Sequence, residues 1–307
     1  MFPIIPANTA SSLPENDEGI FAGGLKTSWT KTNETNLVSN AGVVASDGAG
    51  IGTARRGPAA CEYGDDKGIL GFGSQAPGYV STTQLVSNTG VVASDQAASA
   101  GTARVQLAAC AYGGDKGIFG FGYDGNPNYA GMTNLVSNAG VVASDTAAVG
   151  TARTHLAACE YGGDKGIFAM GVTHSTPIIT NLVSNTGVVS SDVAGAGTSR
   201  ESPAGCSYGG DKGIFGFGNK AGDVVTAVSN LVSNAGVVSS DVAAVGTARR
   251  ALAGCEYGGD KGIFGFGKVP PTSWQSITNL VSNTGVVATD TVGVGTARSY
   301  LTACSFN

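Results

Sequence analysis

Three residue types that could do chemistry recur along the chain at a nearly constant interval. Cysteines are separated by 49, 49, 47, 49 and 49 residues (Cys61, Cys110, Cys159, Cys206, Cys255 and Cys304). An aspartate follows each "VVAS", "VVSS" or "VVAT" (Asp47, Asp95, Asp145, Asp192, Asp241 and Asp290). An arginine ends each "TAR" or "TSR" (Arg55, Arg104, Arg153, Arg200, Arg249 and Arg298). Disulfides, metal ligation and acid–base catalysis are the chemistries that these types could support.

The cysteines fit neither disulfides nor a metal site. One cysteine per repeat, always at the same position, spreads the thiols around the molecule, whereas a disulfide needs Cα atoms within about 7 Å. Metal sites need clustered ligands such as C-x₂-C, and the sequence has no such cluster. We therefore predict six buried free thiols, no metal, and folding in a reducing compartment.

The aspartates and arginines indicate a structural brace. Catalysis needs one asymmetric set of groups, whereas these pairs occur in every repeat. We expect ion pairs or hydrogen bonds that fasten the crossing from one repeat to the next, between residues close in sequence: Asp95 with Arg104, Asp145 with Arg153, and Asp241 with Arg249.

Other signals of an enzyme are missing from the sequence. Its two histidines, His155 and His174, stand at unrelated points of their repeats. The stretch "GFGSQAPG" resembles a phosphate-binding loop only superficially, because no strand, loop and helix unit surrounds it. We predict a protein that is not an enzyme and has no cofactor.

The local sequence of each repeat predicts short strands. A unit reads "TARxxLAACxYG", "GDKGIFGFG", a variable stretch, "TNLVSN" and "GVVASD", and its Gly and Asn-Gly punctuation is too dense for helices. Gly113, Gly114 and Asp115 supply a tight hairpin turn. A repeat of about 49 residues with four short strands is typical of propeller blades.

The two ends of the chain complete each other. The chain stops at "TARSYLTACSFN", a first strand without a "GIFGFG", while residues 16–24 read "NDEGIFAGG" without a first strand before them. We predict an all-β, six-bladed β-propeller of four-stranded antiparallel blades, closed by a last blade that both termini share. The predicted units, numbered 1 to 6, follow a tail over residues 1–12 within a domain over 13–307: 54–95, 103–145, 152–192, 199–241, 248–290, and 297–306 with 17–47.

The repeat resembles a kelch repeat. "TARVQLAACAYGGDKGIFGFG" followed by "TNLVSNAGVVASD" has an arginine before a small apolar strand, a turn, an aromatic strand that ends in glycines, and two further strands. The kelch double glycine remains only as Gly23 and Gly24, and the fourth-strand tryptophan is absent. The "AAC…GIFGFG" core also resembles regulator-of-chromosome-condensation repeats, but the arginine favours kelch. The wording "TNLVSNTGVVATDT" is similar to repeats in tailed-bacteriophage proteins, which implies a virion component.

Charge and hydrophobicity exclude some partners. The net charge is −5, and 11 of the 17 basic residues fall at repeated positions, so no basic face for nucleic acid is expected. The apolar runs are too short for a membrane span. The first residues, "MFPIIPANTASSLP", lack the pattern of a secretion signal.

The units differ most in the sequence that links the second strand to the third. These links should all emerge on one face, and they carry Trp29, Tyr79, Tyr123, Tyr129, His174 and Trp274. Aromatic side chains on loops of a rigid scaffold are common binding anchors. Capping of the outer edge of each blade is an equally open interpretation.

The sequence thus predicts a structural or binding scaffold. The first interpretation is a phage virion component, in the tail, fibre or attachment apparatus, that contacts other virion proteins or host-surface glycans through the variable loops. The alternative is a lectin-like propeller that binds carbohydrate. An intracellular adaptor is a third interpretation, although kelch adaptors normally carry further domains.

Overall fold

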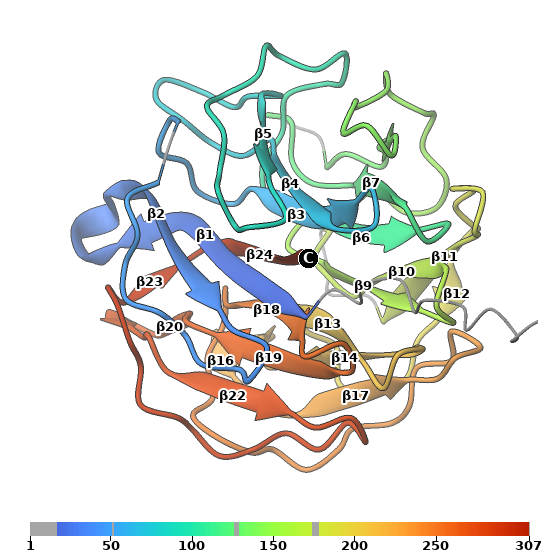
Figure 1. Ribbon diagram of the computed structural model, residues 1–307. Coiled ribbons are helices and arrows are strands. Elements are labelled where there is room, and N and C mark those ends of the chain that lie inside the picture. The colour runs from blue at the N-terminus through green and yellow to red at the C-terminus, as the bar shows by residue number, and fades with distance from the viewer. Residues whose placement is uncertain (1–16, 51, 126–128, 174–177, 307) are drawn as a thin grey trace, which may run out of the picture.

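Small antiparallel β-sheets make up the protein (Figure 1). The computed structural model describes residues 17–50, 52–125, 129–173 and 178–306. Within these ranges the chain forms strands, turns and a single 3-10 turn, η1 (Thr27–Trp29), and no α-helix. The predicted tail over residues 1–12 lies outside the described residues. The prediction of an all-β fold is confirmed.

Every unit contributes three main strands. The first strands contain the cysteines: β3 (Ala59–Tyr63), β6 (Ala108–Tyr112), β9 (Ala157–Tyr161), β13 (Ala204–Tyr208), β18 (Ala253–Tyr257) and β24 (Thr302–Phe306). The second strands are β4 (Lys67–Gly71), β7 (Lys116–Gly120), β10 (Lys165–Ala169), β14 (Lys212–Gly216), β19 (Lys261–Gly265) and β1 (Glu18–Lys26). The third strands are β5 (Thr83–Val86), β8 (Thr133–Val136), β11 (Ile179–Val183), β17 (Ser229–Val232), β22 (Thr278–Val281) and β2 (Lys31–Val38).

Six further strands have only two residues each. They are β12 (Val193–Ala194), β15 (Asn219–Lys220), β16 (Val224–Val225), β20 (Lys268–Val269), β21 (Ser273–Trp274) and β23 (Arg298–Ser299). The pairs β15–β16 and β20–β21 are small hairpins within the variable links of units 4 and 5.

The two ends of the chain share one sheet, as the sequence predicts. Strand β1 pairs with β2 on one side and with β24 and β23 on the other, all antiparallel. In this register Ile20 lies opposite Cys304, the same pairing that Ile118 makes with Cys110 within unit 2. The composite sheet therefore repeats the arrangement of the continuous ones.

The expectation of four full strands per unit is wrong for most units. In units 1, 2, 4 and 5 the sheet has three strands, and the "GVVASD" segment joins it through isolated bridges such as Val136 to Val142. The third-strand asparagine also contacts this segment, since Asn134 Nδ2 donates to the Ala143 carbonyl at 3.0 Å. In unit 3 a two-residue strand, β12, follows this segment and pairs with β11.

Consecutive units interlock through glycines of the repeated phrase. A Cβ added to the first glycine of "KGIFG" would lie no more than 2.8 Å from the cysteine Sγ of the preceding unit, in all six units. The second glycine of that motif faces a phenylalanine of the next unit, as Gly120 faces Phe168. Units 3 and 6 have alanine at this position: Ala169 packs against Phe215 of unit 4, whereas Ala22 packs against the smaller Leu70 of unit 1. The phrase recurs because each interface needs the same small residues.

The first strands follow one another without a free end. Strand β3 contacts β6, β6 contacts β9, and the succession runs through β13, β18 and β24 back to β3. A circle of six backbone hydrogen bonds of 2.7–3.1 Å joins the residues that precede these strands, each N–H donating to the carbonyl of the unit before it. Its members are Gly57, Gln106, His155, Ser202, Ala251 and Tyr300.

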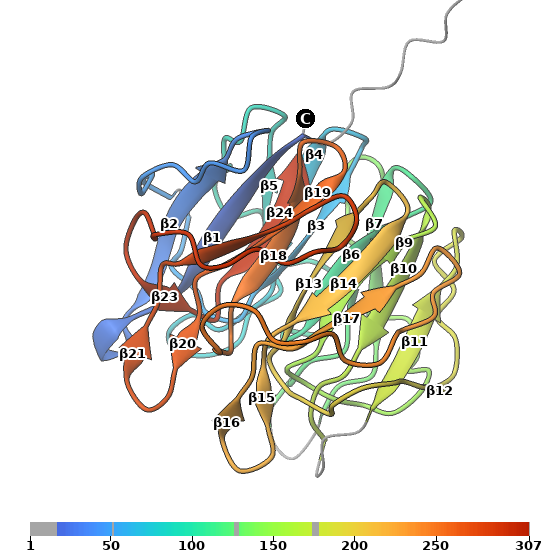
Figure 2. The same cartoon turned by 90° about the horizontal axis from the view of Figure 1, so that it is seen from below.

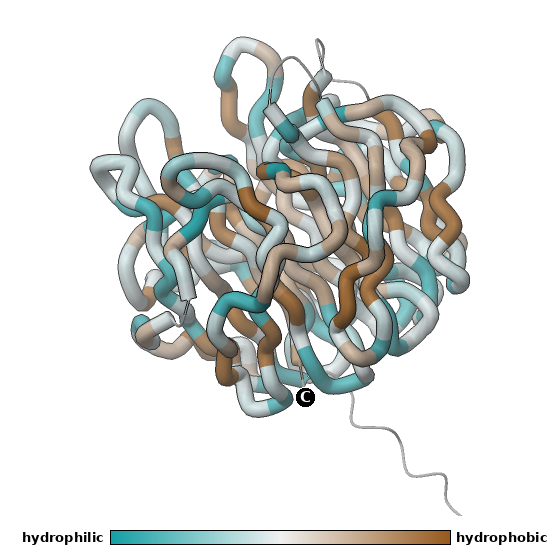
Figure 3. Tube along the Cα trace, turned by 90° about the horizontal axis from the view of Figure 1, so that it is seen from above, coloured by the Kyte–Doolittle hydropathy of each residue, from teal (hydrophilic) through white to brown (hydrophobic). Residues whose placement is uncertain are grey.

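The sheets have two distinct ends (Figure 2). One end, the hairpin face, carries the Asp-Lys turns between first and second strands, and the C-terminus lies there. The other end, the variable face, carries η1 and the hairpins β15–β16 and β20–β21. Hydrophobic and hydrophilic segments alternate closely along the chain (Figure 3), because core strands and polar turns are both short.

Candidate functional site

The repeated arginine and aspartate belong to a buried hydrogen-bond network, which we call the clamp. In unit 2, Arg104 donates from Nε to the Phe121 carbonyl at 2.8 Å, from Nη1 to the Thr102 carbonyl at 3.1 Å, and from Nη2 to Asn134 Oδ1 at 2.7 Å. Asp145 accepts from Asn134 Nδ2 at 2.9 Å and from the Thr102 hydroxyl at 2.5 Å. Each of the three nitrogens of this guanidinium therefore donates to a protein acceptor.

The expected pairing of neighbours in sequence is wrong. In four units an ion pair joins the aspartate to the arginine that begins the same unit: Arg55 with Asp95, Arg104 with Asp145, Arg200 with Asp241, and Arg298 with Asp47. The third strand explains this in units 2, 4, 5 and 6, because its asparagine bonds both the arginine and the aspartate of the same unit. In unit 1, which has Gln84 at this position, Arg55 bonds Asp95 directly. The clamp therefore fastens the beginning of a unit to its end.

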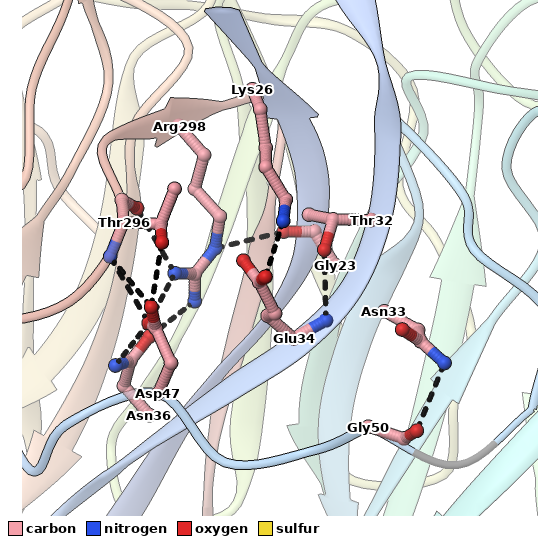
Figure 4. Close-up of polar contacts among 10 residues, drawn as sticks. All are labelled: Gly23, Lys26, Thr32, Asn33, Glu34, Asn36, Asp47, Gly50, Thr296 and Arg298. Carbon is pink, nitrogen blue, oxygen red and sulfur yellow. Dashed lines mark hydrogen bonds and ion pairs between the residues drawn. The ribbon is translucent and has the colours of Figure 1, made fainter.

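The composite unit has the same clamp, made from both ends of the chain (Figure 4). Arg298 donates to the Gly23 carbonyl at 3.0 Å and to Asn36 Oδ1 at 2.6 Å. Asp47 accepts from the Thr296 backbone N–H at 2.9 Å and from its hydroxyl at 2.6 Å. These contacts join residues more than 240 positions apart in the sequence.

Burial and hydrogen bonding set the charge of the clamp. Burial lowers the pKa of Arg104 to about 10, and the charge of Asp145 opposes that shift. Burial acts to raise the pKa of Asp145, but hydrogen bonds from Thr102 and Asn134 outweigh it and leave the pKa below its usual value. Both groups are charged near neutral pH, and the guanidinium is fully buried.

The arginines also reach the preceding unit. The guanidinium of Arg104 lies 4.4 Å from the centre of the Phe72 ring, and that of Arg298 lies 4.2 Å from the Phe266 ring. Such cation–π contacts stabilise more strongly when the cation is desolvated. The clamp thus stabilises each unit and its contact with the preceding unit, which indicates a structural role.

The cysteines are free and buried, as predicted. Burial raises the pKa of each thiol well above its ordinary value, Cys110 among them. Buried thiols of raised pKa are poor nucleophiles and poor metal ligands. Within the described part of the chain, no group of three His, Cys, Asp or Glu side chains is placed to hold a metal ion.

The aromatic residues of the variable links gather into two clusters. Trp29 and Trp274, from units 6 and 5, have ring centres 5.8 Å apart at 85°. Tyr123 lies 6.0 Å from Tyr79 and 6.3 Å from Tyr129. Trp29 is 59% exposed, whereas the other four are partly buried. Binding and edge capping both remain predictions for these residues, and His174 lies outside the described residues.

A second group on the variable face lies at the centre of the molecule. The residues of the hydrogen-bonded circle line a cavity of about 70 Å³, together with Leu107, Leu156, Leu252 and Leu301. All six circle residues have positive φ, between 52° and 58°, although only Gly57 is a glycine. Burial lowers the pKa of His155 to about 4, and its Nδ1 has no hydrogen-bond partner.

Sequence reasoning missed these central residues, although a signal was present. The position two residues after each "TAR" arginine varies freely, while the clamp on one side and the "AAC" strand on the other hardly change. A variable position between constant ones indicates that packing in the core does not determine its side chain. The central circle and the variable links share one face, so variation among the units is concentrated there.

Two comparisons, with family models and with curated proteins, give no match. No family model matches the chain. No curated protein matches it either. Across the described residues, no helix has the length and apolar character needed to cross a membrane.

Proposed function

We propose that the six units form a closed, six-bladed β-propeller whose last blade is shared by the two termini. The circle of six backbone hydrogen bonds supports this proposal, because such a circle needs one donor and one acceptor from every unit. The pairing of β24 with β1 supports the shared blade. Closure leaves no exposed edge at the ends of the array. We also propose that the units are kelch-like, because an arginine precedes the first strand of each unit.

Within this architecture, we propose that the protein is a non-enzymatic scaffold that binds its partners through the variable face. The observation that carries the proposal is the separation of constant and variable residues. The interlocking glycines, the clamp and the Asp-Lys hairpins repeat almost unchanged, whereas the central circle and the links differ in every unit. A rigid scaffold with one individual face is typical of a binding protein.

The setting that we propose is a phage virion, with other virion proteins or the host surface as partners. It follows from the similarity of the repeats to those of tailed-bacteriophage proteins. A lectin-like propeller is the second candidate. The exposed indole of Trp29 favours it, because flat aromatic faces stack on sugar rings.

The buried thiols provide a test of the binding face. Because all six native cysteines are buried, a new surface cysteine can be modified selectively with polyethylene glycol maleimide. Val224, on the variable face, and Val237, after a turn on the hairpin face, are 52% and 65% exposed. Binding to proteins encoded by neighbouring genes, and to a glycan array, is then measured for modified Val224→Cys and Val237→Cys.

The two modified proteins should behave differently. We expect the polymer on residue 224 to reduce binding at least about tenfold, while the polymer on residue 237 leaves binding unchanged. Equal binding by both would refute the variable face as the binding face. Binding to glycans alone would favour the lectin over the virion scaffold.

A further inference from the structure

Charge is distributed unevenly between the two faces. Of the 17 basic residues, six belong to the clamps and five to the Asp-Lys hairpins. The other six all lie on the variable face: Lys26, Lys31, Arg56, Lys220, Arg250 and Lys268. That face has four acidic residues, Glu34, Asp124, Glu201 and Asp223. A protein of net charge −5 thus concentrates its non-repeated cations on the face with the exposed tryptophan.

Lys268 is held between two indole rings. Its Nζ lies 4.5 Å from the centre of the Trp29 ring and 4.7 Å from that of Trp274. The residue is only 5% exposed, and within the described chain its ammonium group has no carboxylate within ion-pair distance. Burial and the nearby charge of Arg250 lower its pKa, and the charge of Asp223 opposes this shift. A buried cation with no carboxylate in direct contact is costly, and an anion supplied by a ligand would relieve that cost.

Two more cations lie on the same face, one in unit 6 and one in unit 1. Lys31 follows Trp29 by two residues, and Arg56 lies close enough to lower the pKa of Lys31, after burial, the larger cause. Among the described residues, neither side chain forms an ion pair. We call the set of Trp29, Trp274, Lys268, Lys31 and Arg56 the basic aromatic patch. It extends from unit 5 across unit 6 to unit 1.

The backbone presents Trp29 at some conformational cost. Ser28 and Trp29 both have positive φ, 69° and 62°, where residues other than glycine are uncommon. Trp274 packs against the indole at 85° and supports it from one side, and the β20–β21 hairpin carries this support (Figure 2). Strain retained at an exposed aromatic side chain indicates a functional position.

We propose that the basic aromatic patch binds an acidic carbohydrate, a sugar ring that bears a carboxylate. The ring would stack on the exposed face of Trp29, and the carboxylate would pair with Lys268, Lys31 or Arg56. Stacking on a flat aromatic face and neutralisation of nearby cations are both required for such a ligand. An acidic peptide would use the cations alone, because its carboxylates sit on flexible chains without a rigid ring to stack.

This inference rests on the proposed function in one respect: both place the binding site on the variable face. The probe is trigalacturonic acid, and its neutral trimethyl ester is the matched control with the same ring. Isothermal titration in about 20 mM salt should show binding of the acid at least about tenfold tighter than binding of the ester. The difference should shrink in 0.5 M salt, where the Debye length falls to about 4 Å.

Three variants separate stacking from charge. Trp29→Ala, at an exposed position, should weaken binding of the acid at least about tenfold. Lys268→Met keeps the apolar stem between the indoles and should reduce the preference for acid over ester, because Lys31 and Arg56 remain. Lys220→Gln removes one charge from the same face in unit 4, outside the patch, and should leave affinity unchanged. Circular dichroism and the melting temperature verify that each variant is folded.

Several results would overturn the inference. Equal affinity for acid and ester would exclude recognition of the carboxylate, and full binding by Trp29→Ala would exclude stacking. A hexaglutamate peptide that binds as tightly as the sugar, and does so without Trp29, would assign the patch to acidic peptides. The scaffold proposal stands in each case if the polymer at residue 224 still blocks the partner, so the two failures are distinguishable.

Discussion

At the scale of single residues, the clamp shows how a charged group is accommodated inside a small β-sheet unit. The arginine is buried, yet its donors meet two carbonyl oxygens and one asparagine in unit 2. The asparagine is the central member, because it accepts from the arginine and donates both to the aspartate and to the outer segment. Its loss would leave several buried polar atoms without partners at once.

The clamp predicts a large effect of Asn134→Ala. The substitution leaves Arg104 Nη2 and the Ala143 carbonyl without their partners, and we expect a loss of about 3 kcal/mol in the free energy of unfolding. Asn138→Ala is the matched control in the same unit, since its exposed side chain bonds only Asp115, and it should cost less than about 0.5 kcal/mol. Urea denaturation measures both; similar losses would contradict the role of the clamp.

His155 predicts a specific pH dependence. Its folded-state pKa of about 4 is below the value of about 6.5 expected when unfolded, because burial outweighs the opposing charge of Glu201. Between these values the unfolded chain binds a proton that the folded protein does not. Stability contributed by the neutral imidazole is therefore present above pH 6.5 and is lost as pH falls toward 4.

The His155→Gln variant isolates this contribution, because Gln106 occupies the equivalent position of unit 2 with the same backbone conformation. We expect the native protein to lose up to about 3 kcal/mol more than the variant between pH 7 and 4.5. Urea unfolding at four pH values measures the difference. Parallel pH profiles would show that this imidazole is not held neutral by burial.

At the scale of elements, the fold follows largely from the repeated phrase. The strand positions, the tight turns and the contribution of both termini to one sheet were predictable, because glycine turns and short apolar runs specify hairpins locally. The missing fourth strand was not predictable, since a short apolar run does not distinguish a continuous strand from isolated bridges. The clamp partners were also missed, because residues close in sequence need not contact each other when the chain between them crosses from one sheet to the next.

The candidate site was predictable only in part. The variable links and their aromatic residues were found by comparing the units, and the pairing of Trp29 with Trp274 agrees with their similar "TSW" contexts. The central circle escaped notice because its residues share a backbone conformation and no side-chain type. Only the arrangement of all six units in space brings them together.

Interlocking between elements predicts a coupled pair of mutations. A Cβ at Gly166 would lie 2.5 Å from the Cys110 Sγ of the preceding unit, so Gly166→Ala should lose about 2 kcal/mol. In the Cys110→Ala background the same change should cost at least about 1 kcal/mol less, because the obstructing sulfur is gone. Gly78→Ala, with no atom within 4 Å of the added Cβ, is the control. Additive losses in unfolding experiments would contradict the interlock.

At the scale of the whole molecule, the units are similar parts that differ mainly on one face. Similar interfaces between neighbours explain why composition and spacing vary so little along the chain. Such an array is stable only if its first and last members are also covered, which here requires both ends of the chain in one sheet. Closure is therefore the claim on which the scaffold and its binding face both depend.

Cross-linking of the two chain ends tests this claim most directly. Ser46 and Val294 are exposed neighbours of the Asp47–Thr296 contact, and the native thiols are buried. Ser46→Cys/Val294→Cys should form an intramolecular cross-link with a short bismaleimide in native buffer. Ser46→Cys/Val149→Cys, with the second cysteine at the equivalent position of unit 3, should not. Absence of a cross-link in the first pair, or equal cross-linking in both, would contradict a closed arrangement of six units.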